Sequence, residues 1–168
     1  MVEKERMYNY KLFIPTAGIG SRVSSYSNNL NKGLISIDNK PVLSHILEKF
    51  HPNVEVVIAL GHGGDYVKQY LEIVYSDRSF TFVNIKKYVG EGTGLGLTLN
   101  SCKKHLQSPF VFVSNDTIFE EQLYFDEIKY NWLGYSTTPA GSNYRSLDLD
   151  DDGNVTQLND KIIDSKDY

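Results

Sequence analysis

Cysteine is nearly absent from this 168-residue sequence, and so are long apolar runs. The single cysteine, Cys102, can form neither an intramolecular disulfide nor a cysteine-rich zinc site, which agrees with a reducing compartment. No apolar stretch approaches the ~20 residues of a membrane span, and the charged first residues, MVEKERMYNYK, contain no secretory h-region. These absences predict a cytoplasmic protein that has no membrane partner.

Basic residues are not in excess either. The chain has 17 lysines and arginines against 21 aspartates and glutamates, a net charge of −4. It therefore has no overall positive field that could hold a nucleic-acid backbone, and nucleic acid is not an expected partner. Any anion that the protein binds must be held by a local group of residues.

The remaining composition, with 40% hydrophobic, 12% aromatic and 23% charged residues, is that of an ordinary globular domain. A chain of this length buries roughly 70% of the surface that its unfolded form exposes, which is enough for one core. We therefore expect residues 1–168 to form a single domain.

Short β-rich runs alternate with amphipathic stretches along most of the chain, a pattern typical of βαβ units around a mostly parallel sheet. Buried strands are predicted at residues 11–15, 54–60, 80–85 and 110–114. Helices are predicted at residues 41–50, 66–74 and 95–106, the first with Asp38 and Asn39 as cap candidates. Further alternation predicts strands at residues 133–137, 144–149 and 155–158, the last two joined by a DDGN turn as a hairpin. The fold class is therefore α/β with a C-terminal β-hairpin.

The first predicted strand runs into a glycine-bearing turn, PTAGIGSR, at residues 15–22. Gly18 and Gly20 would let backbone N–H groups approach a phosphate, and Arg22 could grip two phosphate oxygens. A tight strand-to-helix connection is the alternative interpretation. A dinucleotide fingerprint would need a third glycine where the chain has Val23, and there is no Walker A motif.

Three segments together carry a family resemblance: AGIGSR at residues 17–22, Asn31-Lys32, and NKPVL at residues 39–43. In order and spacing they resemble the opening of the sugar nucleotidyltransferases, or nucleoside-diphosphate-sugar pyrophosphorylases, whose signature reads G-x-G-S/T-R, then P-K, then G-K/N-K-P. Asn31 stands where that family usually has proline. The resemblance implies a Rossmann-like three-layer sandwich, the GT-A-like nucleotidyltransferase fold, for the N-terminal catalytic part of such an enzyme.

Two later segments extend the resemblance. GEGTGLGL at residues 90–97 is similar to the family's G-T-A-G-A-L segment, which lies against the nucleotide base. VFVSNDT at residues 111–117 is similar to the strand that ends in N/G-D, whose aspartate binds the catalytic magnesium ion. This assigns that role to Asp116, for which the N-cap of a following helix is the alternative.

The closing segment, residues 143–161, resembles a family hairpin that places Lys161 near the acceptor phosphate. The family normally continues beyond this point with a second metal-binding aspartate. We therefore expect the chain to be shortened at its C-terminus relative to the family, and a C-terminal continuation or a homo-oligomer to complete the site.

The resemblance implies transfer of NMP from an NTP to a sugar 1-phosphate or a similar small phosphorylated acceptor, with release of pyrophosphate. The products would feed surface-glycan synthesis, such as that of capsule or lipopolysaccharide. Mg²⁺ would be the cofactor, with Asp116 as its ligand. The implied catalytic residues are Arg22, Lys32 and Asp116. The implied nucleotide-binding residues are Ala17, Gly18, Gly20, Ser21, Gly92, Thr93 and Gly94, and the implied acceptor-binding residue is Lys161.

Other function classes stay open at this point. A noncatalytic nucleotide-binding or regulatory module could keep the same glycine turn, and a dinucleotide-dependent oxidoreductase could keep the fold with different glycines. The acidic run at residues 148–152 fits the first half of an EF-hand loop, but Asn159 in the twelfth position offers no bidentate carboxylate. A hairpin turn is the preferred interpretation of that run.

Overall fold

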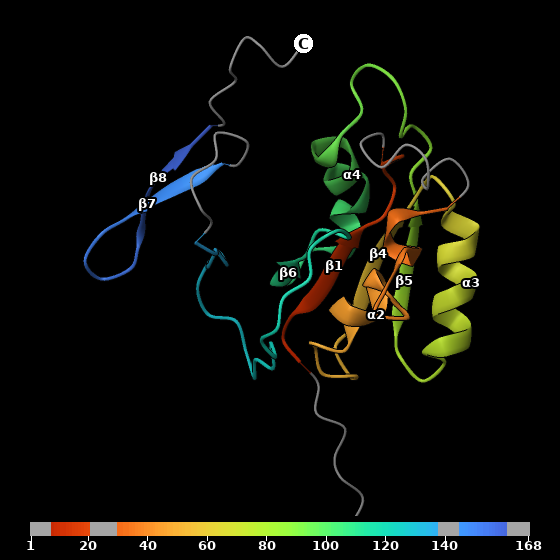
Figure 1. Ribbon diagram of the computed structural model, residues 1–168, viewed down its shortest axis with the longest axis horizontal. Helices are drawn as coiled ribbons and strands as arrows, with labels where there is room; N and C mark the ends of the chain where they lie inside the picture. Colours follow the sequence, from red (N-terminus) through yellow and green to blue (C-terminus); the bar gives the residue numbers. More distant parts are fainter. Residues whose placement is uncertain (1–7, 21–29, 138–144, 161–168) are drawn as a thin grey trace, which may run out of the picture. The chain divides into compact units, whose positions relative to one another are not determined.

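The computed structural model describes residues 8–20, 30–137 and 145–160 (Figure 1). The chain divides into two compact units, Met1–Tyr130 and Asn131–Tyr168, and each is described by itself. In the described part, no helix is both long and apolar enough to cross a membrane.

The first unit is built on a parallel sheet. Its strands stand in the order β5-β4-β1-β6, and each adjacent pair runs parallel. The bounds are Lys11–Pro15 for β1, Val56–Leu60 for β4, Phe80–Asn84 for β5 and Phe110–Phe112 for β6. All four strands predicted for this region are thus confirmed, with ends that differ by two residues or fewer.

Helices cover both faces of this sheet. Leu12 and Ile14 of β1 pack in one buried cluster with α2 (Val42–Leu47) and α3 (Gly64–Val74). Phe13, between them, packs in a second cluster with Cys102 at the end of α4 (Leu95–Cys102). Successive side chains of a strand point to opposite faces, so these two clusters lie on the two sides of the sheet. The three-layer fold class is confirmed.

The helices differ from the prediction at their ends. Asp38 and Asn39 do not cap α2, because both have positive φ, +50° and +62°, and form the turn between β2 (Ser36–Ile37) and β3 (Lys40–Pro41). Asn and Asp tolerate this left-handed backbone better than most residues. After α4, the chain continues as the 3₁₀ helix η3 (Lys103–His105).

The second unit contains the predicted hairpin, with β7 (Ser146–Leu149) antiparallel to β8 (Val155–Asn159). Its turn is held by the Asp150 carboxylate, whose Oδ1 accepts the backbone N–H groups of Asp152 and Asn154 at 3.1 and 2.7 Å. The acidic run is therefore a turn between strands and not an EF-hand loop. The strand predicted at residues 133–137 is wrong: these residues are exposed and irregular, since alternation alone supplies no partner strand.

Arg78 ties the α3–β5 connection to the end of α2. Its two terminal nitrogens donate to the carbonyl oxygens of Leu47 and His51 at 2.9 and 3.2 Å, and burial lowers its pKa to about 10. We expect Arg78→Met to lower the free energy of unfolding by about 2 kcal/mol, because it removes two charged-donor hydrogen bonds. Urea denaturation measures this, with Lys68→Met on the exposed surface of α3 as the control. Equal urea midpoints for Arg78→Met and Lys68→Met would show that the hydrogen bonds of Arg78 do not stabilise the fold.

Candidate active site

The order of the strands reverses beside β1. The chain passes from β1 to β4 and β5 on one side, and then returns through α4 to β6 on the other. In open parallel sheets ligands bind outside the carboxyl ends of the strands at such a switch point. Figure 1 shows the loops that follow β1 and β5 at the same end of the sheet. The residues just past Pro15 and Phe112 are therefore where a ligand is expected.

Lys32 and Asp116 meet at this point, although they lie far apart in the sequence. Lys32 begins the short helix η2 (Lys32–Leu34), and its Nζ lies 3.5 Å from Oδ2 of Asp116, which follows β6. The lysine side chain is 15% exposed and the aspartate side chain 48% exposed, so the pair opens to solvent on the aspartate's side. The N-cap alternative for Asp116 is wrong, because residues 117–137 contain no helix.

The Asp116 carboxyl is held in its ionised form. Ser114 Oγ donates to its Oδ1 at 2.6 Å, and this hydrogen bond, with the charge of Lys32, lowers the pKa of Asp116 despite partial burial. An ionised, half-exposed carboxylate is a ligand that a hard divalent cation prefers.

Gly20 and the stem of Lys32 are in close approach. Gly20 has φ +67°, and a Cβ placed there would lie 2.5 Å from Cε of Lys32. Only glycine combines this backbone with room for the lysine, so the turn and the lysine form one surface. Gly18 is exposed with nothing within 4 Å of its Cβ position, whereas Ala17 is buried and its carbonyl oxygen accepts the N–H of His62 at 3.1 Å. The nucleotide-binding role of Ala17 stays a prediction.

Asn31 is the residue whose importance sequence reasoning missed. Its side chain is fully buried, and its Nδ2 donates to the carbonyl oxygens of Thr16 and His62, both at 2.7 Å. Its Oδ1 accepts the backbone N–H of Gly33 at 3.0 Å. The one available signal was a polar residue beside the site lysine, at the position where the family has proline.

The glycine-rich loop before α4 follows β5 and so lies at the same carboxyl edge of the sheet. Gly90, Gly92 and Gly94 all have positive φ, at +92°, +75° and +148°, and Thr93 Oγ1 donates to the Gly90 carbonyl at 2.6 Å. No hydrogen bond or ion pair of the described residues joins this loop to Lys32 or Asp116. Its role in binding a nucleotide base therefore stays a prediction.

Three of the predicted site residues, Ser21, Arg22 and Lys161, lie outside the described residues. Their assigned roles also stay predictions from the sequence.

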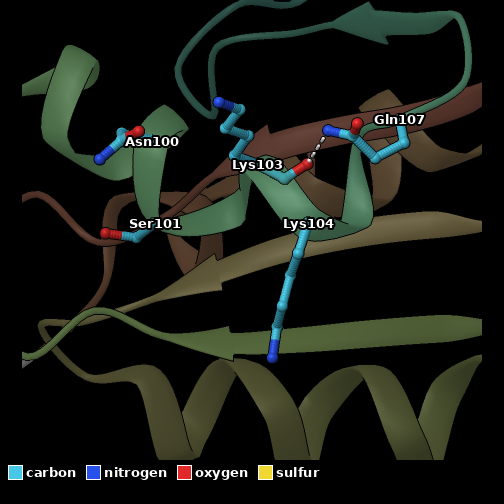
Figure 2. A pocket seen from close by; sticks show the side chains of 5 residues that line it. All are labelled: Asn100, Ser101, Lys103, Lys104 and Gln107. Carbon is cyan, nitrogen blue, oxygen red and sulfur yellow. Dashed lines mark hydrogen bonds between the residues drawn. The ribbon is translucent and has the colours of Figure 1, made fainter.

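A hollow of about 500 Å³ lies elsewhere, on the outer side of α4 and η3. It is lined by Asn100, Ser101, Lys103, Lys104 and Gln107. Figure 2 shows the two lysine side chains extending in different directions, so their charges do not converge on one point. This hollow contains none of the predicted site residues.

Replacing Gly94 tests the glycine-rich loop. No atom lies within 4 Å of its Cβ position, so Gly94→Val adds a side chain on the proposed base-binding surface, but its φ of +148° is one that a branched side chain rarely adopts, and the backbone is strained as well. We expect NTP affinity to fall about tenfold, or ~1.4 kcal/mol. The matched control is Gly153→Val in the turn between β7 and β8, which also has a positive φ, +80°, and open space at its Cβ position, and which should keep the parental NTP affinity. Isothermal titration with NTP measures the affinities, and equal values for the two variants would place the base elsewhere.

No family model matches the chain, but individual relatives do. It is 27% identical over 147 residues to the bifunctional protein GlmU of Methanococcus vannielii, covering 86% of this chain and 34% of that protein. Two relatives come from Haloferax volcanii. The low-salt glycan biosynthesis nucleotidyltransferase Agl11 is 28% identical over 157 residues, 87% of this chain and 43% of Agl11. The UTP–glucose-1-phosphate uridylyltransferase AglF is 24% identical over 109 residues, 64% of this chain and 43% of AglF.

Solved structures share the fold. The CTP:phosphocholine cytidylyltransferase LicC from Streptococcus pneumoniae superposes with a TM-score of 0.64 at 18% identity, covering 89% of this chain and 64% of LicC. HddC from Yersinia pseudotuberculosis superposes with a TM-score of 0.59 at 20% identity, covering 90% of this chain and 69% of HddC.

The chain spans about a third of the length of GlmU and less than half of Agl11 and AglF. The expectation from the motifs is confirmed within that span: over most of its length the chain is similar in sequence to sugar nucleotidyltransferases, and it shares its fold with a solved nucleotidyltransferase.

Proposed function

We propose that this chain contains the nucleotide-binding and catalytic part of a nucleotidyltransferase, which transfers NMP from an NTP to a sugar 1-phosphate or a similar phosphorylated acceptor and releases pyrophosphate. The observation that carries the proposal is the Lys32–Asp116 pair at the switch point of the sheet, with the Gly20 turn packed against the lysine. A cation, an ionised carboxylate and an open glycine turn at one place are suited to a nucleoside triphosphate.

The reaction needs positioning and charge neutralisation, and no nucleophilic side chain. A phosphate oxygen of the acceptor attacks the α-phosphorus in line and forms a new P–O bond, while the bond between the α-phosphorus and the bridging oxygen breaks and pyrophosphate leaves. Lys32 would neutralise the charge that develops around the α-phosphate. Arg22 and the backbone N–H groups near Gly18 would hold the leaving pyrophosphate.

The residues present fit a magnesium ion held mainly by its substrate. Among the described residues, no three His, Cys, Asp or Glu side chains gather into a complete metal cage. Mg²⁺ in such sites commonly has one or two carboxylates, with phosphates and waters as its other ligands, and Asp116 can supply one. When bound, the ion would neutralise phosphate charge as a Lewis acid. A second carboxylate from a C-terminal continuation or a second copy of the chain stays our expectation.

The names of the relatives support a role in glycan precursor synthesis. AglF is named for UTP and glucose 1-phosphate, and Agl11 for glycan biosynthesis. We extend this to the present chain as part of the proposal, with a sugar 1-phosphate as the first acceptor to test and the cytoplasm as the compartment where NTP and acceptor meet.

The test is pyrophosphate release across the four NTPs and dTTP with a panel of sugar 1-phosphates, together with calorimetric titration of each nucleotide with and without Mg²⁺. Release that requires both substrates is the expected result. Nucleotide binding without release, in this chain and in any longer natural form, would favour the noncatalytic module. If the chain neither binds a nucleotide nor releases pyrophosphate, the nucleotidyltransferase and the noncatalytic nucleotide-binding module are both wrong.

A further inference from the structure

The buried carboxamide of Asn31 lies where three strands of the sheet end. Through Nδ2 it holds the Thr16 carbonyl just past β1 and the His62 carbonyl just past β4, and through Oδ1 it holds the N–H of Gly33. On the remaining side, Nδ2 of Asn115 lies 3.5 Å from the same Oδ1, just past β6. Both donors and the acceptor of this amide are thus used within the protein, and none is left for a ligand.

These contacts join the neighbours of the two charged site residues. Asn31 precedes Lys32 in the chain, and Asn115 precedes Asp116. A shift of the Asn31 amide would therefore move the lysine turn relative to the strand ends that carry the carboxylate. Packed residues with saturated hydrogen bonds resist such a shift, because moving the amide would leave buried donors and acceptors unpaired.

The backbone of Asn31 has the conformation of a proline, with φ −65° and ψ 139°. The family residue at this position would therefore fit the same backbone. In this chain the turn is held by the side-chain hydrogen bonds of Asn31, which a proline would not make. Asn31→Pro therefore tests those bonds by themselves, because proline keeps the φ and removes the bonds.

We propose that Asn31 is a positioning residue, whose carboxamide holds the Lys32 turn against the ends of β1, β4 and β6 and so keeps the lysine within reach of Asp116. The proposal rests on the proposed function for its catalytic meaning. Its geometric content, the placement of Lys32, can be tested without any nucleotide.

The first readout is acetylation of individual lysines by a small excess of acetic anhydride, followed by mass spectrometry. The Lys32 side chain is 15% exposed, against 38% for Lys40, which serves as the internal reference. We expect Asn31→Pro and Asn31→Asp to raise the labelling of Lys32 relative to Lys40 several-fold, because the lysine leaves its place over Gly20. The matched control is Ser44→Ala, which removes a similarly buried polar contact, the one with Tyr70, and which takes part in none of the hydrogen bonds of Asn31.

The second readout is kinetic. A misplacement of about 1 Å can lower turnover as much as 10²-fold, so we expect the Asn31 variants to lose at least about tenfold in kcat, with a smaller change in the KM for NTP. The control Ser44→Ala, compared with an Asn31 variant of equal melting temperature, should keep the parental kcat and the parental KM for NTP. A merely structural role would lower the melting temperature alike in all variants and leave the labelling ratio and kcat of the folded protein unchanged.

Unchanged Lys32 labelling in the folded Asn31→Pro variant overturns the proposal. If neither Asn31 variant folds, Asn115→Ala decides, since it removes the donor that lies next to Asp116; it should raise Lys32 labelling in the same direction, and no rise would overturn the proposal. If the parent chain binds no NTP at all, the proposed function fails, but the labelling result for Asn31 remains interpretable.

Discussion

Replacing Lys32 with methionine should lower pyrophosphate release, or NTP affinity where turnover is slow, by about 10²-fold, on the order of 3 kcal/mol. Methionine keeps an unbranched stem over Gly20 and removes only the charge that would face the α-phosphate. Folding stability should change little, because the partner carboxylate is half exposed and such ion pairs contribute about 0–1 kcal/mol. Titration of Mg²⁺·NTP, the pyrophosphate assay and a melting curve measure the three quantities.

Asp116→Asn is expected to have an effect of similar size that appears only with Mg²⁺ present, because the amide keeps the shape but loses the charge. Arg22→Ala should weaken NTP binding likewise, a prediction that rests on the sequence, where a guanidinium follows the glycine-bearing turn. Lys40→Met is the matched control, since Lys40 pairs with Glu48 on the surface outside the site. If Lys32→Met and Asp116→Asn both keep the parental NTP affinity and pyrophosphate release, this pair does not face the nucleotide.

Much of the fold could be predicted from the sequence, because the buried strands of a parallel sheet appear as short apolar runs. The run KLFIP predicts β1 with both ends correct. A different signal, alternation, predicts a strand at residues 133–137 that does not form, because alternation says nothing about the presence of a partner strand. Asp38 and Asn39 were misassigned because the same side chains suit a helix cap and a left-handed turn, and only the backbone distinguishes them.

The site could be predicted in its parts but not in its assembly. The motifs point to Lys32 and Asp116 separately, whereas their contact depends on the order of the strands, which brings β6 beside β1. Asn31 could not be recognised as the link, because Thr16, His62 and Asn115, which its side chain contacts, follow three different strands. A close approach of two backbones is equally invisible to a sequence pattern, and Gly61 provides the clearest case.

Gly61→Ala is expected to reduce both stability and nucleotide binding. Gly61 follows β4, and a Cβ there would lie 2.5 Å from the carbonyl oxygen and 2.7 Å from the Cα of Ala17. These backbone atoms are held in place by hydrogen bonds. The N–H of His62 donates to the same Ala17 oxygen at 3.1 Å, and the hydroxyl of Thr16 donates to the Ala59 carbonyl. The added methyl group must push the glycine turn away from β4, at a cost of about 1–3 kcal/mol.

Gly18→Ala separates the two effects of this substitution. Gly18 lies in the glycine turn itself, and nothing is within 4 Å of its Cβ position, so the melting temperature of Gly18→Ala should match that of the parent. The added methyl group should nevertheless obstruct the approach of a phosphate to the backbone. We therefore expect Gly61→Ala to lower the urea midpoint and NTP affinity together, and Gly18→Ala to lower affinity alone. A parental urea midpoint in Gly61→Ala would mean that β4 and the turn are not in contact in solution, and parental NTP affinity in Gly18→Ala would mean that the turn does not hold the phosphates.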